Sequence, residues 1–275
     1  MTPLKGKCVV ILGASSGIGA EIGTYCLKQG ASVHFVARRE ERLITQVASV
    51  EDAISRASYS VCDATDYLAI HQMMEEVYQK YSTVDLWINC TGQNKAIGKF
   101  WELNPQTIWE EVEVNLKSCM NGTHVALGQM VKANKGIIIN FCGGGAAHPH
   151  LYAAAYSASK TAIARFTEAT MLELEKEESN VKVFAVNPGL VYNERTAALC
   201  ESEEGKRFMP EIECAFAEGR CQPAETVIKF IEATLTGDLN EYAGRLVQAP
   251  KNLQALTEKN SELKGTLTGF LRPVH

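Results

Sequence analysis

Short, almost continuously apolar runs alternate with longer amphipathic stretches along most of the chain. The apolar runs predict strands at residues 7–12, 32–37, 58–62, 84–90, 136–142, 181–187 and 245–248. The stretches between them predict helices near residues 18–29, 40–54, 66–80, 105–132, 154–177 and 222–236. Strands that are apolar on both faces are typical of a parallel sheet covered by helices on each side. We therefore expect an α/β fold, a Rossmann-like doubly wound parallel sheet of about seven strands.

Two segments break this alternation. Residues 188–221 form a long, weakly patterned segment rich in Glu, in which Glu194 and Arg195 either add a polar contact or face water. Long segments after the carboxyl end of a strand often carry ligand contacts, so we assign residues 188–221 to the substrate side. Residues 249–275 form a polar tail, for which packing or disorder is the simpler interpretation. The chain has 275 residues, an ordinary length for one large domain, which we expect to cover residues 1–248.

Composition and charge narrow the classes of partner. The net charge is −5 and no basic block is present, so we expect no nucleic-acid partner, because phosphate neutralisation needs clustered Lys and Arg. No apolar run approaches the roughly 18 residues that cross a bilayer, and the first residues lack a signal-peptide pattern. We therefore expect a cytoplasmic protein without a membrane partner. Nine cysteines without a Cys-x-x-Cys pair indicate reduced core thiols, and no closely spaced ligands predict a metal site.

The first predicted strand runs into a glycine-rich turn and then a helix. A strand, a glycine turn and a helix N-terminus form an anion site, because free N–H groups point at the ligand and glycines let it come close to the backbone. We expect the turn to hold the pyrophosphate of a dinucleotide through Gly13, Ser15, Ser16, Gly17, Ile18 and Gly19.

The ends of the next strands predict the rest of the nucleotide site. The second strand ends in Arg38 and Arg39, where an acid would favour NAD by binding the ribose 2′-hydroxyl. Guanidinium groups suit a 2′-phosphate, so the sequence favours NADP(H). Asp63, just past the third strand, is placed to accept from the adenine amine. Asn89, Thr91 and Gly92, after the fourth strand, would line the adenine and ribose side.

Tyr156 and Lys160 open a long predicted helix. Residues four apart share a helix face, so the two side chains are neighbours. A nearby ammonium lowers the pKa of a phenol by favouring phenolate. The pair is therefore a candidate general acid/base for hydride transfer to a carbonyl, which needs one proton delivered to the oxygen.

In their order and spacing, the glycine turn, Asp63, the 89–92 turn, Asn115, the Tyr156-x-x-x-Lys160 motif and Pro188-Gly189 resemble the short-chain dehydrogenase/reductase family over roughly residues 5–248. The resemblance implies NAD(P)(H)-dependent oxidoreduction of a small-molecule carbonyl or alcohol. It implies that Tyr156 is the acid/base, that Lys160 binds ribose, and that Asn115 holds a water. Pro188, Gly189 and Val191 would contact the cofactor. It also implies a homodimer or homotetramer through the helices at 105–132 and 154–177.

Three departures from the family pattern stand out. Leu12 stands where the first motif begins with Thr, and Cys90 and Thr91 replace the middle pair of Asn-Asn-Ala-Gly. The third departure is chemical: Gly143 occupies the position of the catalytic Ser, thirteen residues before the Tyr.

Several groups are candidates to replace the missing hydroxyl. The neighbouring Cys142 thiol is a weak donor, and strand alternation points it away. A backbone N–H of Gly143 or Gly144 is one candidate, and the side chains of His148, His150 and Tyr152 are others. The hypothesis is an NADP(H)-dependent oxidoreductase acting on a carbonyl, an alcohol or an activated enone. The alternative is an atypical member that binds nucleotide for a non-redox or regulatory role.

Overall fold

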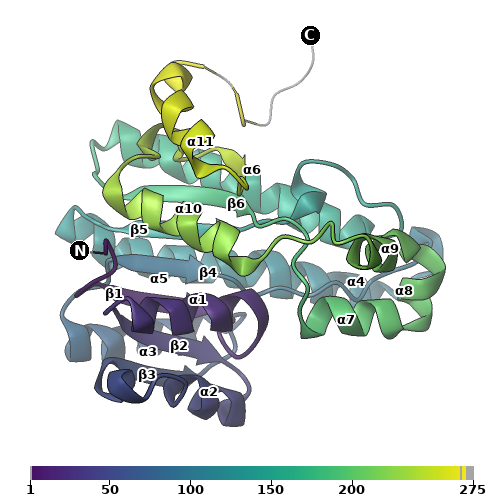
Figure 1. Ribbon diagram of the computed structural model, residues 1–275, viewed down its shortest axis with the longest axis horizontal. Coiled ribbons are helices and arrows are strands. Elements are labelled where there is room, and N and C mark those ends of the chain that lie inside the picture. The colour runs from purple at the N-terminus through teal and green to yellow at the C-terminus, as the bar shows by residue number, and fades with distance from the viewer. Residues whose placement is uncertain (1, 267, 271–275) are drawn as a thin grey trace.

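Seven parallel strands form the centre of the molecule in the computed structural model, which describes residues 2–266 and 268–270 (Figure 1). The strand order is β3-β2-β1-β4-β5-β6-β7, and every neighbouring pair is parallel. This confirms the predicted Rossmann-like fold, and each strand overlaps a predicted apolar run. The strands are β1 Cys8–Leu12, β2 Ser32–Ala37, β3 Ala57–Val61, β4 Leu86–Asn89, β5 Ile137–Phe141, β6 Lys182–Asn187 and β7 Leu246–Gln248.

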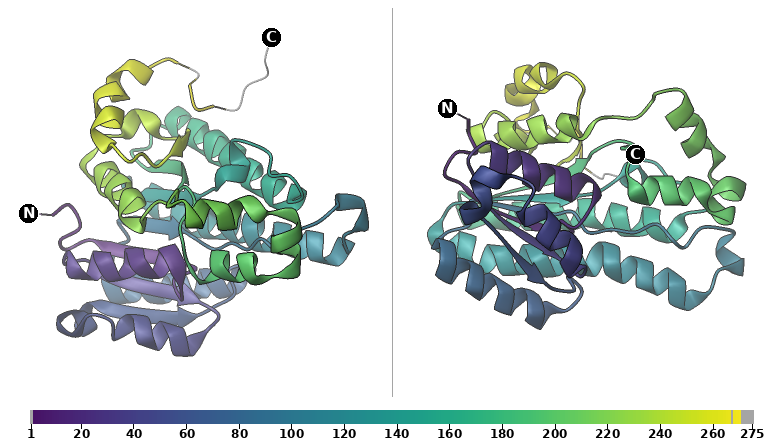
Figure 2. Two further views of the ribbon diagram at one scale, coloured as in Figure 1. Left: turned by 45° about the vertical axis from the view of Figure 1, so that its right-hand side comes forward. Right: turned by 60° about the horizontal axis from the view of Figure 1, so that its bottom comes forward.

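Helices cover both faces of the sheet (Figures 1 and 2). Helices α1 (Gly17–Lys28) and α10 (Ala224–Thr236) pack together on one face. On the other face, α5 (Ser118–Ala133) contacts both α3 (Tyr67–Tyr81) and α6 (Ala154–Lys176). The largest fully buried side chains, Trp87, Phe35 and Phe184, come from strands of the sheet. Burial on both faces explains why these strands have continuous apolar sequences.

The strand order reverses beside β1, because β1 pairs with β2 on one side and with β4 on the other. Chain connections leave the sheet in opposite directions at such a point and open a crevice beyond the carboxyl ends of the strands. The register pairs Leu12 with Asn89, so the glycine turn after β1 meets the turn after β4 at this crevice.

Two predicted helices are interrupted. The helix expected at 40–54 ends as α2 (Glu40–Val47), and a 3₁₀ turn follows at Glu51–Arg56. Val50 between them has an extended backbone, which suits a β-branched residue. The helix expected at 105–132 is α4 (Pro105–Val112), a π-helical turn at Glu113–Lys117, and α5. A π turn inside a helix frequently marks a functional site, and this one carries Asn115.

The segment 188–221 contains three short helices, although its weak hydrophobic pattern predicted no regular secondary structure. They are α7 (Glu194–Glu201), α8 (Glu203–Phe208) and α9 (Pro210–Ala217). Each helix buries a single residue fully, so no hydrophobic period was long enough to be seen. Local caps start two of them: Asn193 and Thr196 form a reciprocal capping box on α7, and Ser202 caps α8.

The tail packs against the domain over its described part. Helix α11 (Leu253–Lys259) is followed by a 3₁₀ turn at Asn260–Leu263. The buried Arg245 side chain donates hydrogen bonds to the carbonyl oxygens of Leu263, Thr266 and Thr268. Residues 267 and 271–275 of the expected tail lie outside the described residues. None of the helices in the described part of the chain combines the length and apolar character needed to cross a bilayer.

Candidate active site

Two adjoining cavities open along the carboxyl edge of the sheet. The nucleotide-side cavity, of about 420 Å³, is lined by the turns after β1, β2, β3 and β4. The tyrosine-side cavity, of about 660 Å³, is lined by the turns after β5 and β6 and by the segment 188–221. Both cavities are lined by Ile18, Cys90, Thr91, Asn193 and Arg195. Because they share these walls, one molecule can extend from the first cavity into the second.

The glycine turn has the shape of an anion site. Gly13 has φ +84°, and a Cβ there would lie 2.8 Å from the backbone N of Thr91. A side chain at Gly19 would press on the carbonyl of Gly13. Helix α1 begins at Gly17 with no side chain capping its first N–H groups and no acid in its first turn. These open N–H groups at the positive end of the helix fit a pyrophosphate.

Both arginines at the end of β2 lie beside this turn. Arg39 Nη2 donates to Ser15 Oγ at 3.0 Å and to Ser16 Oγ at 2.7 Å. Arg38 Nη1 is 3.5 Å from Asp63 Oδ2, and the Arg38 side chain is 66% exposed. The edge of the nucleotide-side cavity therefore carries two guanidinium groups and two hydroxyls, a donor set that fits the 2′-phosphate of NADP(H).

Asp63 is held in place as a carboxylate. Its Oδ1 accepts hydrogen bonds from the backbone N–H of Thr65 at 2.9 Å and from the Thr65 hydroxyl at 2.8 Å. Partial burial alone would raise the pKa of Asp63, but the Thr65 hydrogen bonds and the Arg38 guanidinium outweigh it and lower that pKa. Asp63 is thus an ionised acceptor on the wall of the nucleotide-side cavity.

Asn89 is a correction to the predicted cofactor residues. Its Oδ1 accepts from Trp87 Nε1 at 2.8 Å, and its Nδ2 donates to Thr123 Oγ1 and Asn140 Oδ1. The side chain is buried in this network and does not line either cavity. Asn89 therefore ties β4 to β5 and α5, because a strand residue whose side chain points between sheet and helix cannot also face the crevice.

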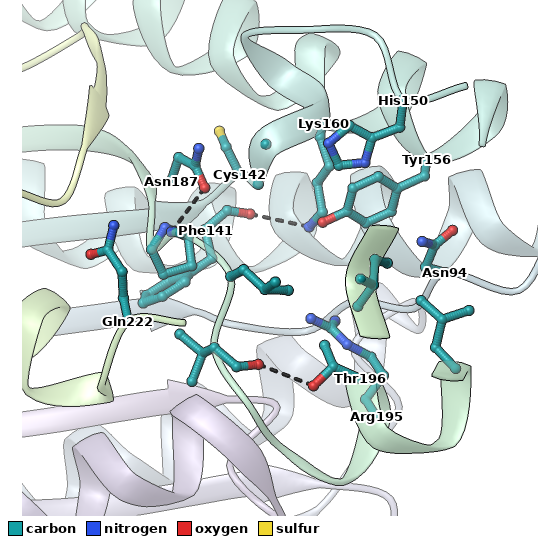
Figure 3. A pocket seen from close by; sticks show the side chains of 18 of the residues that line it. Asn94, Phe141, Cys142, His150, Tyr156, Lys160, Asn187, Arg195, Thr196 and Gln222 are labelled. Atoms are coloured by element: carbon teal, nitrogen blue, oxygen red, sulfur yellow. Dashed lines mark hydrogen bonds between the residues drawn. The ribbon is translucent and has the colours of Figure 1, made fainter. Parts of the chain in front are cut away.

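Tyr156 and Lys160 lie in the first two turns of α6, and their side chains are close to each other (Figure 3). Lys160 Nζ is 5.8 Å from the centre of the Tyr156 ring and donates to the Phe141 carbonyl at 3.1 Å. The two side chains are 8% and 2% exposed. The structure thus brings the predicted pair together on the wall of the tyrosine-side cavity.

Asn115 joins this group from the π turn. Its Oδ1 accepts from the Gln93 backbone N–H at 2.8 Å, and its Nδ2 donates to the Gln93 carbonyl and to Ser159 Oγ. A Cβ on Gly92 would lie 3.1 Å from Asn115 Oδ1 and 3.3 Å from Lys160 Nζ. The π turn therefore places Asn115 against helix α6 and the turn after β4.

The protonation of this pair differs from the sequence expectation. Burial raises the pKa of Tyr156, and the Arg195 guanidinium only partly opposes this. Burial also lowers the pKa of Lys160. The expected lowering of the tyrosine pKa by a nearby ammonium does not hold in this structure, because loss of water disfavours both charged forms. Tyr156 is a protonated phenol near neutral pH, which is the form that donates a proton.

At Gly143, where the family pattern has a serine, the Tyr156 hydroxyl occupies the space that a side chain would need. A Cβ on Gly143 would overlap the Tyr156 hydroxyl, and a Cβ on Gly144 would lie 2.9 Å from His150 Nε2. The backbone of Gly143 is extended, with φ 169°, so its conformation alone would accept any residue. The two glycines leave the space that the two rings occupy. The His150 ring stacks on the Tyr156 ring with centroids 5.9 Å apart and planes 17° apart.

The other candidate replacements for the serine hydroxyl, at His148, Tyr152 and Cys142, have no contact with Tyr156 of the kind that His150 makes. His148 is exposed, although it lines the cavity mouth. Tyr152 has φ 60° and its ring packs on Phe208 with centroids 4.9 Å apart. Cys142 is buried with Cys119, and burial raises the pKa of the Cys142 thiol to about 12. Cys142 therefore stays a protonated thiol, as expected for a core cysteine.

The turn after β6 carries the remaining predicted cofactor residues. Pro188, Gly189 and Val191 all line the tyrosine-side cavity. The Gly189 N–H donates to Asn187 Oδ1 at 3.1 Å, and Gly189 has φ +80°, which favours glycine. These residues form the part of the wall that connects β6 to helix α7.

Arg195 is a site residue that the sequence left undecided. Its Nη1 donates to the Gly92 carbonyl at 3.3 Å, and Arg195 lines both cavities. Figure 3 shows its side chain among those that line the tyrosine-side cavity. Its neighbour Glu194 accepts two hydrogen bonds from Arg42 on α2. This ion pair joins α7 to α2 beside the nucleotide-side cavity, which Glu194 lines. Only the tertiary position of α7 reveals either contact.

Glu111 on α4 is a second residue that the sequence did not single out. It is fully buried, and its Oε2 accepts from the backbone N–H groups of Lys95 and Ala96. Burial raises the pKa of Glu111, and these hydrogen bonds oppose the shift. Glu111 and Asn115 stand four residues apart on one helix face and together hold the 92–96 loop beside the site.

Comparisons with known sequences agree with this geometry. A family model described as short chain dehydrogenase matches residues 7–204. An uncharacterized oxidoreductase of Staphylococcus epidermidis is 30% identical over 224 residues, covering 82% of this chain and 95% of that protein. A putative ketoacyl reductase of Streptomyces coelicolor is 32% identical over 203 residues, covering 73% of this chain and 77% of that protein.

Solved structures with the same fold carry nucleotides of both kinds. A variant of actinorhodin polyketide ketoreductase with NADPH has a TM-score of 0.79 and 27% identity, covering 90% of this chain and 97% of that chain. An NAD⁺-bound xylitol dehydrogenase has a TM-score of 0.79 and 20% identity, covering 89% of this chain and 98% of that chain. The likeness to the dehydrogenase concerns the fold alone.

Proposed function

The chain belongs to the short-chain dehydrogenase family of oxidoreductases, and from that premise we propose that it transfers hydride between NADP(H) and a carbonyl, alcohol or activated enone. The observation that carries the proposal is the buried Tyr156 phenol beside Lys160, on the wall of a cavity that shares lining residues with the nucleotide-side cavity. A group that holds one proton in such a place suits the acid step of carbonyl reduction.

NADP(H) is proposed as the cofactor because of the charges beside the adenosine end. Arg38 and Arg39 follow β2 directly, and Arg39 already binds the hydroxyls of Ser15 and Ser16. No acid ends β2 to hold a ribose 2′-hydroxyl. The NADPH bound to actinorhodin polyketide ketoreductase supports the same choice.

The residues of the site divide the chemistry between them. When bound, the nicotinamide supplies or accepts the hydride. Tyr156 gives its phenolic proton to the carbonyl oxygen in reduction and takes a proton back in oxidation. Lys160 and Asn115 both lie against Gly92, which supports the proposal that Lys160 binds the nicotinamide ribose and that Asn115 holds a water. Arg195 lines both cavities, and its positive charge partly opposes the rise in the pKa of Tyr156 that burial causes.

The tyrosine-side cavity favours a medium-sized, partly apolar substrate. Its volume of about 660 Å³ lies within the range of small-molecule sites. Its walls combine apolar side chains with a few polar groups, including Leu151, Leu190, Leu199, Met209, Ile212, Asn94 and Arg195. A keto compound with an apolar body and a polar or anionic end matches this lining. The name of the Streptomyces relative, a putative ketoacyl reductase, supports a keto substrate.

A homodimer or homotetramer is part of the proposal. The helices expected to pair, α4 with α5 and α6, each expose large apolar side chains in the single chain: Trp109, Met120, Val131 and Leu172. Exposed apolar side chains of this size favour burial against a partner. Light scattering on the eluting protein would show a mass at least twice that of the chain, and a monomer at micromolar concentration would contradict this part.

The proposed activity is tested by following NADPH absorbance at 340 nm with a panel of ketones, diketones, keto esters and enones. We expect consumption of NADPH that depends on the carbonyl compound, with the alcohol or saturated product identified by mass. The same protein should reduce NADP⁺ when given the product alcohol. Tight NADPH binding without turnover of any class would contradict the enzyme and support the nucleotide-binding alternative.

A further inference from the structure

Two buried or half-buried histidines of this chain are held in opposite ways. His34 in β2 has both ring nitrogens satisfied, with Nδ1 2.8 Å from Ser58 Oγ and Nε2 3.0 Å from Ser60 Oγ. His150 has no hydrogen bond at either ring nitrogen among the described residues, and its Nδ1 is fully buried. A buried polar atom without a partner is uncommon in folded proteins. The hydrogen bonds of His34 explain why a histidine is buried there, whereas no such partners explain the burial of His150.

The burial pattern of His150 selects one tautomer. Burial lowers the pKa of His150, so the ring is neutral near neutral pH and carries one proton. An enclosed N–H without a partner is rarer in proteins than an enclosed acceptor without one. We therefore assign the proton to Nε2, which leaves the Nδ1 lone pair in the enclosed position. His150 presents an N–H donor from the wall of the tyrosine-side cavity.

The His150 and Tyr156 rings both fill the space beside the 143–144 turn. The Tyr156 hydroxyl abuts Gly143, and His150 Nε2 abuts the next residue, Gly144. The two rings stack, which holds the imidazole on the tyrosine (Figure 3). Among the other side chains of the 142–152 loop, His148 is exposed, Tyr152 packs on Phe208, and Cys142 is enclosed. Among the described side chains of this loop, His150 is the one that lines the cavity, stacks on Tyr156 and has no hydrogen-bond partner.

We propose that His150 donates, through Nε2–H, the hydrogen bond to the substrate carbonyl oxygen that Gly143 has no side chain to make. This proposal rests on the proposed oxidoreductase function. The hydride goes to the carbonyl carbon, the Tyr156 proton goes to the oxygen, and His150 keeps its own proton throughout. Its hydrogen bond strengthens as negative charge grows on the oxygen, so it acts on the transition state more than on the bound ketone.

Variants at His150 separate donation from stacking. His150→Phe keeps an aromatic ring on Tyr156 but has no donor, and His150→Gln keeps an N–H donor without an aromatic ring. Loss of one oxyanion donor lowers kcat by about a hundredfold or more. We expect His150→Phe to lose about a hundredfold in kcat while KM changes little, and His150→Gln to lose about tenfold or less. His71→Ala, at an exposed histidine on α3, is the matched control.

Each outcome of the kinetic experiment decides the proposal. A His150→Phe enzyme that turns over like wild type, with NADPH binding intact, would overturn His150 as donor and favour a backbone N–H of the glycine run. Equal losses in His150→Phe and His150→Gln would also overturn it, because a donor would then not rescue. The melting temperature and the NADPH Kd of each variant show whether the fold and the nucleotide site are retained.

A second measurement does not depend on turnover. Long-range ¹H–¹⁵N NMR spectra of ¹⁵N-histidine-labelled wild type, with the His150 signal assigned by its absence in His150→Phe, report the tautomer directly. We expect the neutral Nε2–H form at pH 7. An Nδ1–H form would refute the donor assignment, whereas any form with a proton on Nε2, the doubly protonated ring included, retains the donor. If wild type binds NADPH but reduces no carbonyl, the proposed function fails, and the tautomer alone then decides whether the donor exists.

Discussion

Two glycine-rich turns follow strands of the same sheet and lead toward helices, yet they use their glycines differently. The turn after β1 brings backbone segments together: Gly13 approaches Thr91, and Gly19 approaches Gly13. Its helix N-terminus stays uncapped and open. The turn after β5 is filled by the protein's own side chains, because Tyr156 and His150 occupy the space beside Gly143 and Gly144. One turn leaves room for a ligand, and the other leaves room for the reactive rings.

The difference explains why the first turn keeps the glycines of the family pattern whereas the second turn departs from that pattern at its serine. Pyrophosphate binding needs backbone N–H groups and close approach, which glycines supply in any relative. Polarising a substrate oxygen needs a donor of defined position, and several chemical groups can supply one. A serine lost from the second turn is therefore tolerable if another donor is in place, whereas a glycine lost from the first is not.

The largest effect is expected from removing the proton of Tyr156. Tyr156→Phe keeps the ring and its stacking on His150 but removes the hydroxyl, so kcat should fall by about a thousandfold, within the range for loss of a general acid. The NADPH Kd should stay within about a factor of two, because the nucleotide-side cavity is unchanged. Steady-state rates and NADPH fluorescence titration measure both. Unchanged turnover in this variant would show that Tyr156 is not the general acid.

Acid sensitivity should come from the nucleotide half through His34. Burial, aided by Lys80, lowers the pKa of His34 from 6.5 to about 4 in the native state. Because the unfolded chain takes up this proton first, the His34 contribution is present above pH 6.5 and is lost as the pH falls toward 4, by about 3 kcal/mol in total.

Urea unfolding at pH 7 and at pH 4.5 tests this dependence. The free energy of unfolding of wild type should fall over this interval, and that of His34→Asn should fall by about 2 kcal/mol less, because the titrating group is gone. His71→Asn, at an exposed histidine, should behave like wild type. If His34→Asn follows the wild-type curve, the acid sensitivity belongs to other groups.

Restoring the serine should harm the enzyme. In Gly143→Ser the new Cβ would overlap the Tyr156 hydroxyl, so the ring must move away from its position beside Lys160. Overpacking of a filled site costs about 1–3 kcal/mol, and we expect kcat/KM to fall by at least about tenfold. Gly128→Ser, on an open face of α5 with nothing near the added Cβ, is the control. A gain in activity on restoring the serine would show that Tyr156 and His150 do not fill this turn as described.

The sequence predicted the sheet well and the reactive surroundings less well, for physical reasons. The central parallel strands are buried and apolar on both faces, so they produce a strong local signal. The edge strands β3 and β7 are less buried and their sequences are more polar. Helices α7, α8 and α9 bury one residue each and produce no period. The motif order was enough to bring Tyr156, Lys160 and Asn115 into one group, because each is attached to a predicted element.

What the sequence could not supply depends on surroundings from distant parts of the chain. The raised pKa of Tyr156 comes from burial under elements that only the fold assembles. The inward position of Asn89 depends on partners in α5 and β5. Arg195 reaches the Gly92 carbonyl from a helix whose position no local pattern indicates. The missing hydroxyl was visible in sequence at Gly143, but its candidate replacement was one of several until the rings were placed.

The smallest effect concerns cofactor choice at the first turn, where Arg38→Ala should weaken NADPH binding by about fivefold and leave NADH binding nearly unchanged. A charge-assisted hydrogen bond to the 2′-phosphate is worth more than this in a buried site, but Arg38 is two-thirds exposed, and solvent screening reduces its contribution to about 1 kcal/mol. Arg39, fixed by Ser15 and Ser16, keeps part of the preference. Fluorescence titrations with NADPH and NADH at fixed salt measure the ratio of the two Kd values. If wild type binds both nucleotides equally, the arginines do not select the cofactor, and the first turn is a generic pyrophosphate site whose specificity must be sought elsewhere.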